Sequence, residues 1–345
     1  MINLYSDTQT LPTPEMLAAI ATAELGDDVQ GLDPTVNRLQ EEAARLFGKE
    51  AALLVASGTM GNLVSLMAHG GHGDEVFLDP DAHAYYYEAG ALCSIAGYTP
   101  RFIRAERGRP DPESLRLAIR AANDHFPRPR LLWLENTHNR GGGTILEPGR
   151  QAALVAIARE RGLAVHIDGA RIFNASVALG RPVAELVRDA DSVQFCLSKG
   201  LSCPIGSVVV GSAEFIARAR RARKRLGGGM RQAGIIAACG LVALRTMVDR
   251  LADDHRNARA LAEGLRDVPG IDVDPGSVET NMIYAGIAGW GVESARAVAA
   301  LAQEGVLVSD RPPSEIRIVT HRHFEAGRIP EVIDAFRRAA RRFLG

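Results

Sequence analysis

The sequence predicts an α/β protein whose large domain is a mainly parallel sheet sandwiched by helices. From about residue 50, short apolar runs alternate with segments of helical periodicity, as in a sheet built from crossover helices. The runs are apolar throughout, which is typical of strands buried on both faces. After residue 270 the strands become shorter. We therefore expect a large domain over residues 1–250 and a smaller C-terminal α/β domain over residues 251–345.

Two early helices are predicted by their first residues. Thr13 and Asp33 are N-cap types, and each precedes a proline at the first helical position. In the large domain we expect strands over residues 51–55, 75–78, 101–103, 131–134, 163–167, 192–197 and 207–210, and helices from about 59, over 112–122 and over 149–161. Beyond them we expect helical structure over 230–265, strands over 271–273, 282–284, 306–308 and 315–320, and helices over 292–304 and 329–343.

Composition excludes several classes of function. The 345 residues carry a formal net charge of −1, with 46% hydrophobic and 23% charged residues, so we expect neither nucleic-acid nor membrane binding. The N-terminus lacks a signal-peptide pattern, and four cysteines without a CxxC pair favour a reducing cytoplasm. The basic run over residues 218–225 has helical spacing and fits a solvated helix face or an anion site.

Lys199 is the first candidate for chemistry. The chain has 40 lysine and arginine residues, but only Lys49, Lys199 and Lys224 are lysines. Lys199 follows a short apolar strand and precedes a loop with glycine and proline. An amine in such a place can lose its proton and attack a carbonyl, which an arginine cannot do. The alternative is a loop lysine in contact with water.

Asp168 ends the predicted strand before that of Lys199. In parallel sheets, sites lie at the carboxyl ends of the strands, and a buried carboxylate there needs a partner. That partner is either Arg171, three residues on, or a protonated heterocyclic nitrogen of a ligand. An acid for a pyridinium nitrogen together with a lysine for an aldehyde is the pair that pyridoxal phosphate requires.

Two further stretches supply what remains of such a site. Ser57, Gly58 and Thr59 follow a strand and open a helix, so they could bind a phosphate, although an ordinary capped helix start fits equally well. His83 follows the next strand and precedes an aromatic run. Its imidazole could stack on a pyridine ring, or it could be a loop histidine with a local hydrogen bond.

The ordered motifs of the whole chain resemble the low-specificity L-threonine aldolase family. They are Ser-Asp-Thr (6–8), Gly-Asp-Asp (26–28), Ser-Gly-Thr (57–59), His83, Glu-Asn-Thr-His-Asn (135–139), His-Ile-Asp-Gly-Ala-Arg (166–171), Cys-Leu-Ser-Lys-Gly-Leu (196–201) and Gly-Gly-Gly-Met-Arg-Gln (227–232). The resemblance implies an aspartate-aminotransferase-like large domain, fold type I, and a pyridoxal 5'-phosphate cofactor. It also implies a homotetramer whose sites are shared between subunits.

The resemblance also implies roles for single residues. Lys199 would form a Schiff base with the cofactor, Asp168 would pair with its ring nitrogen, and His83 would stack on the ring. The phosphate would be held by Ser57, Gly58 and Thr59, and by Arg231 and Lys224 reaching a neighbouring subunit. The substrate carboxylate would be bound by Ser6, Arg171 and Arg317. A second histidine, His125, would lie near the substrate hydroxyl.

The implied reaction is cleavage of a β-hydroxy-α-amino acid, such as L-threonine or L-allo-threonine, to glycine and an aldehyde. His83, His125 or a water between them remain alternatives for the base. A β-eliminating lyase on the same fold is the nearest alternative, and a non-catalytic relative is disfavoured because Lys199 and Asp168 are both present. Tyr5 and Gln9 differ from the Arg and Val common in the family, which bears on substrate preference.

Overall fold

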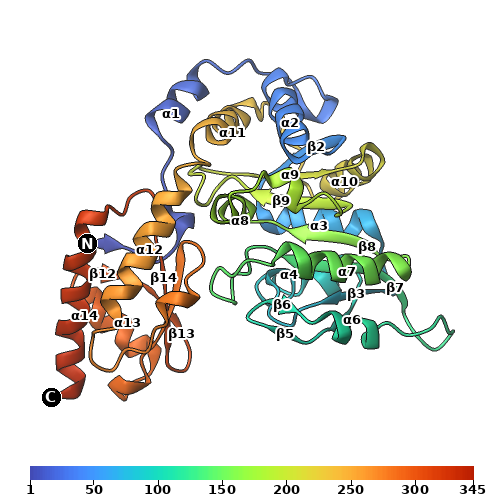
Figure 1. Cartoon of the computed structure of the whole chain (residues 1–345). Coiled ribbons are helices and arrows are strands. Elements are labelled where there is room, and N and C mark those ends of the chain that lie inside the picture. Colours follow the sequence, from blue (N-terminus) through green and yellow to red (C-terminus); the bar gives the residue numbers. More distant parts are fainter.

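A computed structural model describes all 345 residues and shows a large and a small α/β part (Figure 1). The large part contains a seven-stranded sheet. Its strands in spatial order are β2 (Ala51–Val55), β10 (Ser207–Gly211), β9 (Ser192–Cys196), β8 (Ala164–Asp168), β7 (Arg128–Glu135), β3 (Asp74–Leu78) and β4 (Thr99–Phe102). Only β10 is antiparallel to its neighbours. The predicted mainly parallel sheet is therefore confirmed.

Helices cover both faces of this sheet because its strands are apolar on both. Leu53 and Val209 pack with α3 (Gly58–His69) and α10 (Ala213–Arg225) on one face. Leu54 and Val208, which are adjacent to them in sequence, belong to the main core on the other face. The helices of that face include α2 (Pro34–Phe47), α6 (Pro112–Ala118), α7 (Pro148–Glu160), α8 (Ile172–Leu179) and α11 (Gly234–Thr246), with α1 (Pro14–Ala21) packed on α11.

The small part has a second core around a three-stranded antiparallel sheet. The sheet has the order β11 (Met282–Gly286), β14 (Glu315–Val319) and β13 (Ser309–Arg311), and its helices are α12 (Leu251–Leu265), α13 (Ser294–Gln303) and α14 (Ile329–Leu344). The N-terminal strand β1 (Ile2–Asn3) pairs with β12 (Val306–Leu307), so the start of the chain lies beside the small part (Figure 1). The domain boundary at residue 250 stays a prediction.

Short elements complete the chain between these units. They are the helices α4 (His83–Tyr86), α5 (Ala91–Ser94) and α9 (Val183–Leu186), and the hairpin of β5 (Ala105–Glu106) and β6 (Arg109–Pro110). None of the helices combines the length and the apolar character that crossing a membrane requires.

Most predicted elements are present, and the exceptions have physical causes. The helix expected over 112–122 ends at Ala118 because Ile119 turns into the main core with an extended backbone. The helical region over 230–265 is two helices, since α11 packs in the main core and α12 mostly in the second. The strand expected over 271–273 is wrong: only Asp272 pairs, with Gly286. The Asp274-Pro275 turn leaves no room for a longer strand.

The basic run over residues 218–225 is not simply a solvated helix face. It forms the second half of α10, but Arg223 is 2% exposed. Its guanidinium donates to the carbonyl of Leu54 at 2.7 Å and pairs with the buried Asp28 at 2.8 Å. One arginine of the run therefore joins α10 to the N-terminal segment and β2.

Candidate active site

Two cavities lie at the carboxyl edge of the large sheet, and they share two residues. The first, about 150 Å³, is lined by Gly58, Thr59, Asn62, His83, Glu88, Asp168, Ala170, Gln194, Cys196, Ser198 and Lys199. The second, about 370 Å³, is lined by Tyr5, Ser6, Thr8, His83, Tyr87, Asn139, Arg171, Lys199, Tyr284, Ser309, Asp310, Arg311 and Arg317. We call them the inner and the outer cavity. They meet at His83 and Lys199, so one amine and one imidazole face both spaces.

Strand directions explain why these residues meet. The strands β2, β9, β8, β7 and β3 all run the same way, so their carboxyl ends lie on one edge. Asp168 is the last residue of β8, and Lys199 follows β9 by three residues. His83 opens α4 after β3. The predicted convergence of these three residues is thus what the fold produces.

Asp168 is a buried carboxylate held only by neutral donors. It is 1% exposed, and its Oδ1 accepts from Gln194 Nε2 at 2.7 Å and from the backbone nitrogen of Ala170 at 3.1 Å. Its Oδ2 accepts from Asn62 Nδ2 at 2.7 Å. The alternative that Arg171 is the partner of Asp168 is therefore wrong. A buried acid at a cavity wall without a directly paired cation is suited to a cationic ligand atom.

The inner cavity also contains the start of α3. Ser57 caps this helix by accepting from the backbone nitrogen of Met60 at 3.2 Å, while Gly58 and Thr59 line the cavity. A side chain on Gly58 would lie 2.8 Å from Cys196 Sγ, so only glycine leaves this space open. Helix starts bind anions through free backbone N–H groups. Ser-Gly-Thr is thus a capped helix start whose first turn lines the cavity, and phosphate binding there stays a prediction.

His83 is held by carboxylates on two sides. Its Nδ1 lies 2.9 Å from Glu88 Oε1, and its backbone nitrogen donates to Glu135 Oε2 at 2.7 Å. Burial lowers the pKa of His83, but the hydrogen bond with Glu88 and the charge of Asp168 outweigh burial and raise it. The ring centroid of Tyr87 lies 5.3 Å from that of His83. His83 therefore makes the local hydrogen bond that was one of the two predictions for it. Its imidazole ring also faces both cavities.

The trio His83, Glu88 and Asp168 could in principle hold a metal ion. One ligand atom from each lies within 4.8 Å of the others. Asn62 Nδ2, however, donates to both carboxylates, and Glu88 Oε1 also binds His83. Since these donors and acceptors satisfy one another, the trio is a hydrogen-bonded network.

Arg171 lies in the outer cavity with a fixed counter-ion. Its Nε and Nη2 donate to the two oxygens of Asp7, at 2.7 and 2.6 Å, and both side chains are almost completely buried. Burial raises the pKa of Asp7, but the Arg171 guanidinium outweighs it and holds the pKa far below the usual 3.8. Asp7 therefore orients the arginine and leaves its remaining nitrogen for a ligand.

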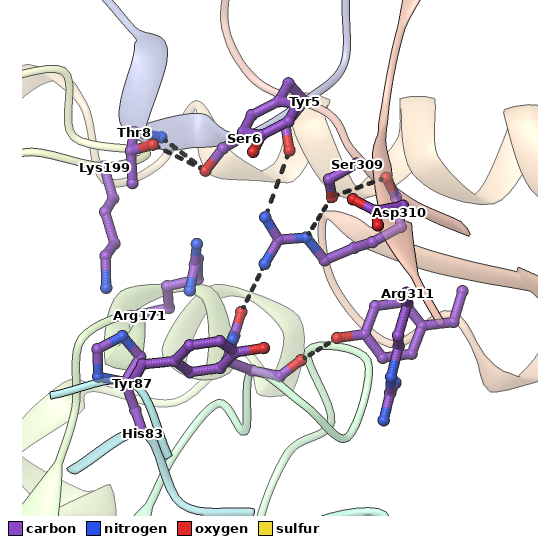
Figure 2. A pocket seen from close by; sticks show the side chains of 13 residues that line it. Tyr5, Ser6, Thr8, His83, Tyr87, Arg171, Lys199, Ser309, Asp310 and Arg311 are labelled. Carbon is purple, nitrogen blue, oxygen red and sulfur yellow. Dashed lines mark hydrogen bonds between the residues drawn. The ribbon is translucent and has the colours of Figure 1, made fainter. Parts of the chain in front are cut away.

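Arg317 enters the same cavity from β14 of the small part. Its guanidinium donates to Ser309 Oγ at 3.1 Å, Asn139 Oδ1 at 3.2 Å and the carbonyl of Tyr5 at 3.4 Å. All three acceptors are uncharged. The nearby Glu315 pairs instead with Arg311, at 3.4 Å. Figure 2 shows Arg171 and Lys199 extending toward the same space, with Ser6 and Tyr5 above it.

Besides Ser57, which caps α3 next to the inner cavity, three predicted site residues lie outside both cavities of the single chain. His125 is exposed on the loop between α6 and β7, where its backbone nitrogen donates to Asn123. Lys224 is exposed at the end of α10, and Arg231 is exposed and pairs with Asp27 at 2.6 Å. Their roles stay predictions.

Sequence reasoning missed several residues that the structure places at the site. They are Asp7, Asn62, Glu88, Tyr87, Asn139, Gln194, Tyr284, Ser309, Asp310 and Arg311. One signal was available for Gln194, an amide between Val193 and Phe195 in a fully buried strand. Glu88 had none. Asp7 lies in the Ser-Asp-Thr motif, but nothing in the sequence indicated its partner, Arg171, which is 164 residues away.

Comparisons with known sequences agree along almost the whole chain. A profile of the beta-eliminating lyase family matches residues 3–288. Low-specificity L-threonine aldolase 1 of Arabidopsis thaliana is 45% identical over 343 residues, covering 98% of this chain and 96% of the plant protein. The low-specificity L-threonine aldolase of Escherichia coli K12 is 43% identical over 334 residues, covering 96% and 97%.

Solved structures show the same fold at lower identity. A threonine aldolase of Leishmania major superposes with a TM-score of 0.83 at 19% identity, covering 99% of this chain and all of the other. A structure of SPT with PLP superposes with a TM-score of 0.77 at 21% identity, covering 99% and 88%. The fold is therefore that of fold type I enzymes. From its sequence matches, the chain belongs to the beta-eliminating lyase family and, within it, to the low-specificity L-threonine aldolases.

Proposed function

We propose that the protein is a carbon-carbon lyase that cleaves L-threonine, L-allo-threonine and related β-hydroxy-α-amino acids to glycine and an aldehyde, with pyridoxal 5'-phosphate as cofactor. One observation carries the proposal. A cavity with an unpaired buried acid meets a second cavity with two arginines, and the lysine and histidine stand where they join. The matched aldolases and the SPT structure with PLP support the same reading.

The inner cavity fits the cofactor. The first turn of α3 offers N–H groups to a phosphate, the side-chain oxygens of Asn62 and Gln194 lack partners, and Asp168 lacks a cation. Lys199 supplies an amine for the aldehyde group, and His83 a ring face. When bound, the protonated pyridine ring accepts the electron pair released at Cα, and Asp168 favours that protonated form.

The outer cavity fits an α-amino acid. Arg171, Arg317 and Ser6 present two fixed cations and a hydroxyl to a carboxylate, and a planar guanidinium matches a carboxylate bidentately. His83 lies at the junction, where the β-carbon of a substrate reaching Lys199 would lie. A base there removes the hydroxyl proton, the Cα–Cβ bond breaks, and a proton returns to Cα to give glycine.

Product analysis tests the proposal. Holoenzyme with L-threonine, L-allo-threonine or L-phenylserine should yield glycine and the matching aldehyde in equal amounts. The family profile also names β-elimination, which would instead release ammonia and a 2-oxo acid. The proposal is wrong if an aromatic amino acid or a cysteine derivative gives those products and no β-hydroxy substrate gives glycine. The protein would then be a β-eliminating lyase.

We propose further that the enzyme works as a homotetramer in the cytoplasm, with His125, Lys224 and Arg231 completing a neighbour's site. Their exposure outside the cavities and the exposed Leu32 and Ile235 support this. Free cysteines fit a reducing compartment. Inactive Lys199→Ala and Arg231→Ala chains, refolded together, should regain activity. No regain in a mixed oligomer would show that each chain completes its own site.

A further inference from the structure

Glu88 is a buried carboxylate in the inner cavity to which neither the resemblance nor the proposed reaction assigns a task. Its side chain is 2% exposed and lies two residues after α4. A buried carboxylate is costly unless it is paired and hydrogen-bonded. Glu88 makes two contacts through Oε1, to His83 Nδ1 at 2.9 Å and to Asn62 Nδ2 at 2.7 Å. Its position therefore depends on the histidine that joins the two cavities.

Asn62 fixes this carboxylate relative to Asp168. The two hydrogens of one amide nitrogen go to two acids, Glu88 Oε1 and Asp168 Oδ2, each at 2.7 Å. Asn62 is 1% exposed on α3, so the bridge cannot move without repacking the helix. Burial and the charge of Asp168 raise the pKa of Glu88 overall, while the hydrogen bonds from His83 and Asn62 lower it. These two hydrogen bonds are what favour the charged carboxylate.

An ionised carboxylate accepts hydrogen bonds and cannot donate them. The His83 nitrogen facing Glu88 must then carry the proton, so in the neutral ring Nε2 is the acceptor. Four charged groups face His83: Glu88, Asp168, Glu135 and Lys199. Glu135 is engaged by the backbone nitrogens of His83 and Asn139. Only Glu88 therefore bonds the ring.

We propose that Glu88 is a positioning residue that keeps a proton on Nδ1 of His83 and leaves Nε2 free to accept the proton of the substrate β-hydroxyl. This deepens the proposed function and rests on it for the reaction. It selects His83 among the candidate bases, with the carboxylate in the role of an orienting group behind a histidine base. The part that concerns the tautomer holds for the protein without any ligand.

The tautomer can be measured without the reaction. In cofactor-free wild-type protein with ¹⁵N-labelled histidine, His83 signals are assigned by difference from His83→Asn. Above the pKa of the ring, we expect a protonated Nδ1 and an unprotonated Nε2. In Glu88→Met the pKa of His83 should fall by about one unit or more, because a hydrogen-bonded anion is lost. A wild-type ring protonated on Nε2 would overturn the proposal, whether or not the variant folds.

Kinetics then test whether Glu88 acts through His83. Glu88→Met should lower kcat for L-threonine by about tenfold or more and leave KM within about threefold. In a His83→Asn background the same change should cost less than about twofold, because the group being oriented is gone. Equal losses in both backgrounds would show a structural role and reject the proposal.

Glu75 provides a matched control. It is also a buried glutamate with a cationic partner, Arg120 at 2.7 Å, but it lies near the opposite end of β3. Glu75→Met should leave the His83 pKa and tautomer unchanged, and an equal shift there would contradict the proposal. The two proposals fail separately: absence of glycine from wild type would reject the aldolase reading, whereas the NMR result concerns Glu88 alone.

Discussion

The inner and outer cavities are built in different ways. The inner cavity lies within the large part, where Asn62 and Gln194 hold Asp168 from α3 and β9 through bonds of 2.7 Å. The outer cavity combines the N-terminal segment, the large sheet and β14 of the small part, and Arg317 has only three longer bonds to neutral acceptors. The inner site is held by short hydrogen bonds within the large part, while the outer site depends on how the two parts meet. Substitutions in the inner cavity should therefore lower mainly kcat, and loosening the outer cavity should raise mainly KM.

The largest effect is expected at the junction. Lys199→Ala should lower kcat/KM for L-threonine by roughly 10³-fold or more, because the variant lacks the amine that we propose as the carrier of the cofactor. Lys49→Ala is the matched control. Its Nζ donates to the carbonyl of Ala190 at 2.6 Å, away from both cavities. Full turnover by the Lys199 variant would show that Lys199 takes no part in the reaction.

Asp168→Asn should give the next effect, about 10²-fold or more in kcat with little change in KM. The amide keeps the shape of the inner cavity but cannot stabilise a protonated ring nitrogen. Cofactor content, measured by absorbance, should stay near that of wild type. A kcat close to wild type would show that the acid serves packing alone.

Asp7→Asn tests the buried ion pair beside the outer cavity, Asp7 with Arg171, through stability. Removing one partner of a buried pair should lower the free energy of unfolding by about 3 kcal/mol or more. The native pKa of Asp7 lies below its usual 3.8, so the stability from this pair is present above that pH and is lost as pH falls. Denaturant titrations should therefore show a steeper loss below about pH 4 in wild type than in the variant. Equal slopes would contradict the pairing.

Arg317→Lys should give the smallest effect, a rise in KM for L-threonine of about tenfold. The charge remains, but the planar fork that grips a carboxylate is lost. The visible spectrum of the holoenzyme without substrate should not change, since this residue lies in the outer cavity only. Unaltered KM and kcat would exclude the small part from substrate selection.

The same comparison explains what the sequence could predict. Asp168 and Lys199 end neighbouring parallel strands, so the strand pattern alone placed them together. The partner of Arg171 could not be read, because Asp7 is 164 residues away and reaches it through a segment paired with the small part. Glu88 was missed for a related reason: its partners His83 and Asn62 lie on two helices whose relative position no local pattern encodes.

The sequence predicts local features well, but not the surroundings of residues that would act between subunits. The N-caps at Thr13 and Asp33 and the strand at 51–55 were predicted correctly because their signals are local. His125 and Arg231 were assigned by resemblance, and the single chain leaves both exposed. In the proposed tetramer their surroundings would include a second chain, which no periodicity within this one describes.

The most direct test of the junction is chemical labelling. Holoenzyme should show a visible absorption band that borohydride bleaches while it fixes the cofactor covalently, and peptide mapping should then place the label. The account predicts a label on Lys199, the lysine that faces both cavities. A label on Lys49 or Lys224 instead would contradict it.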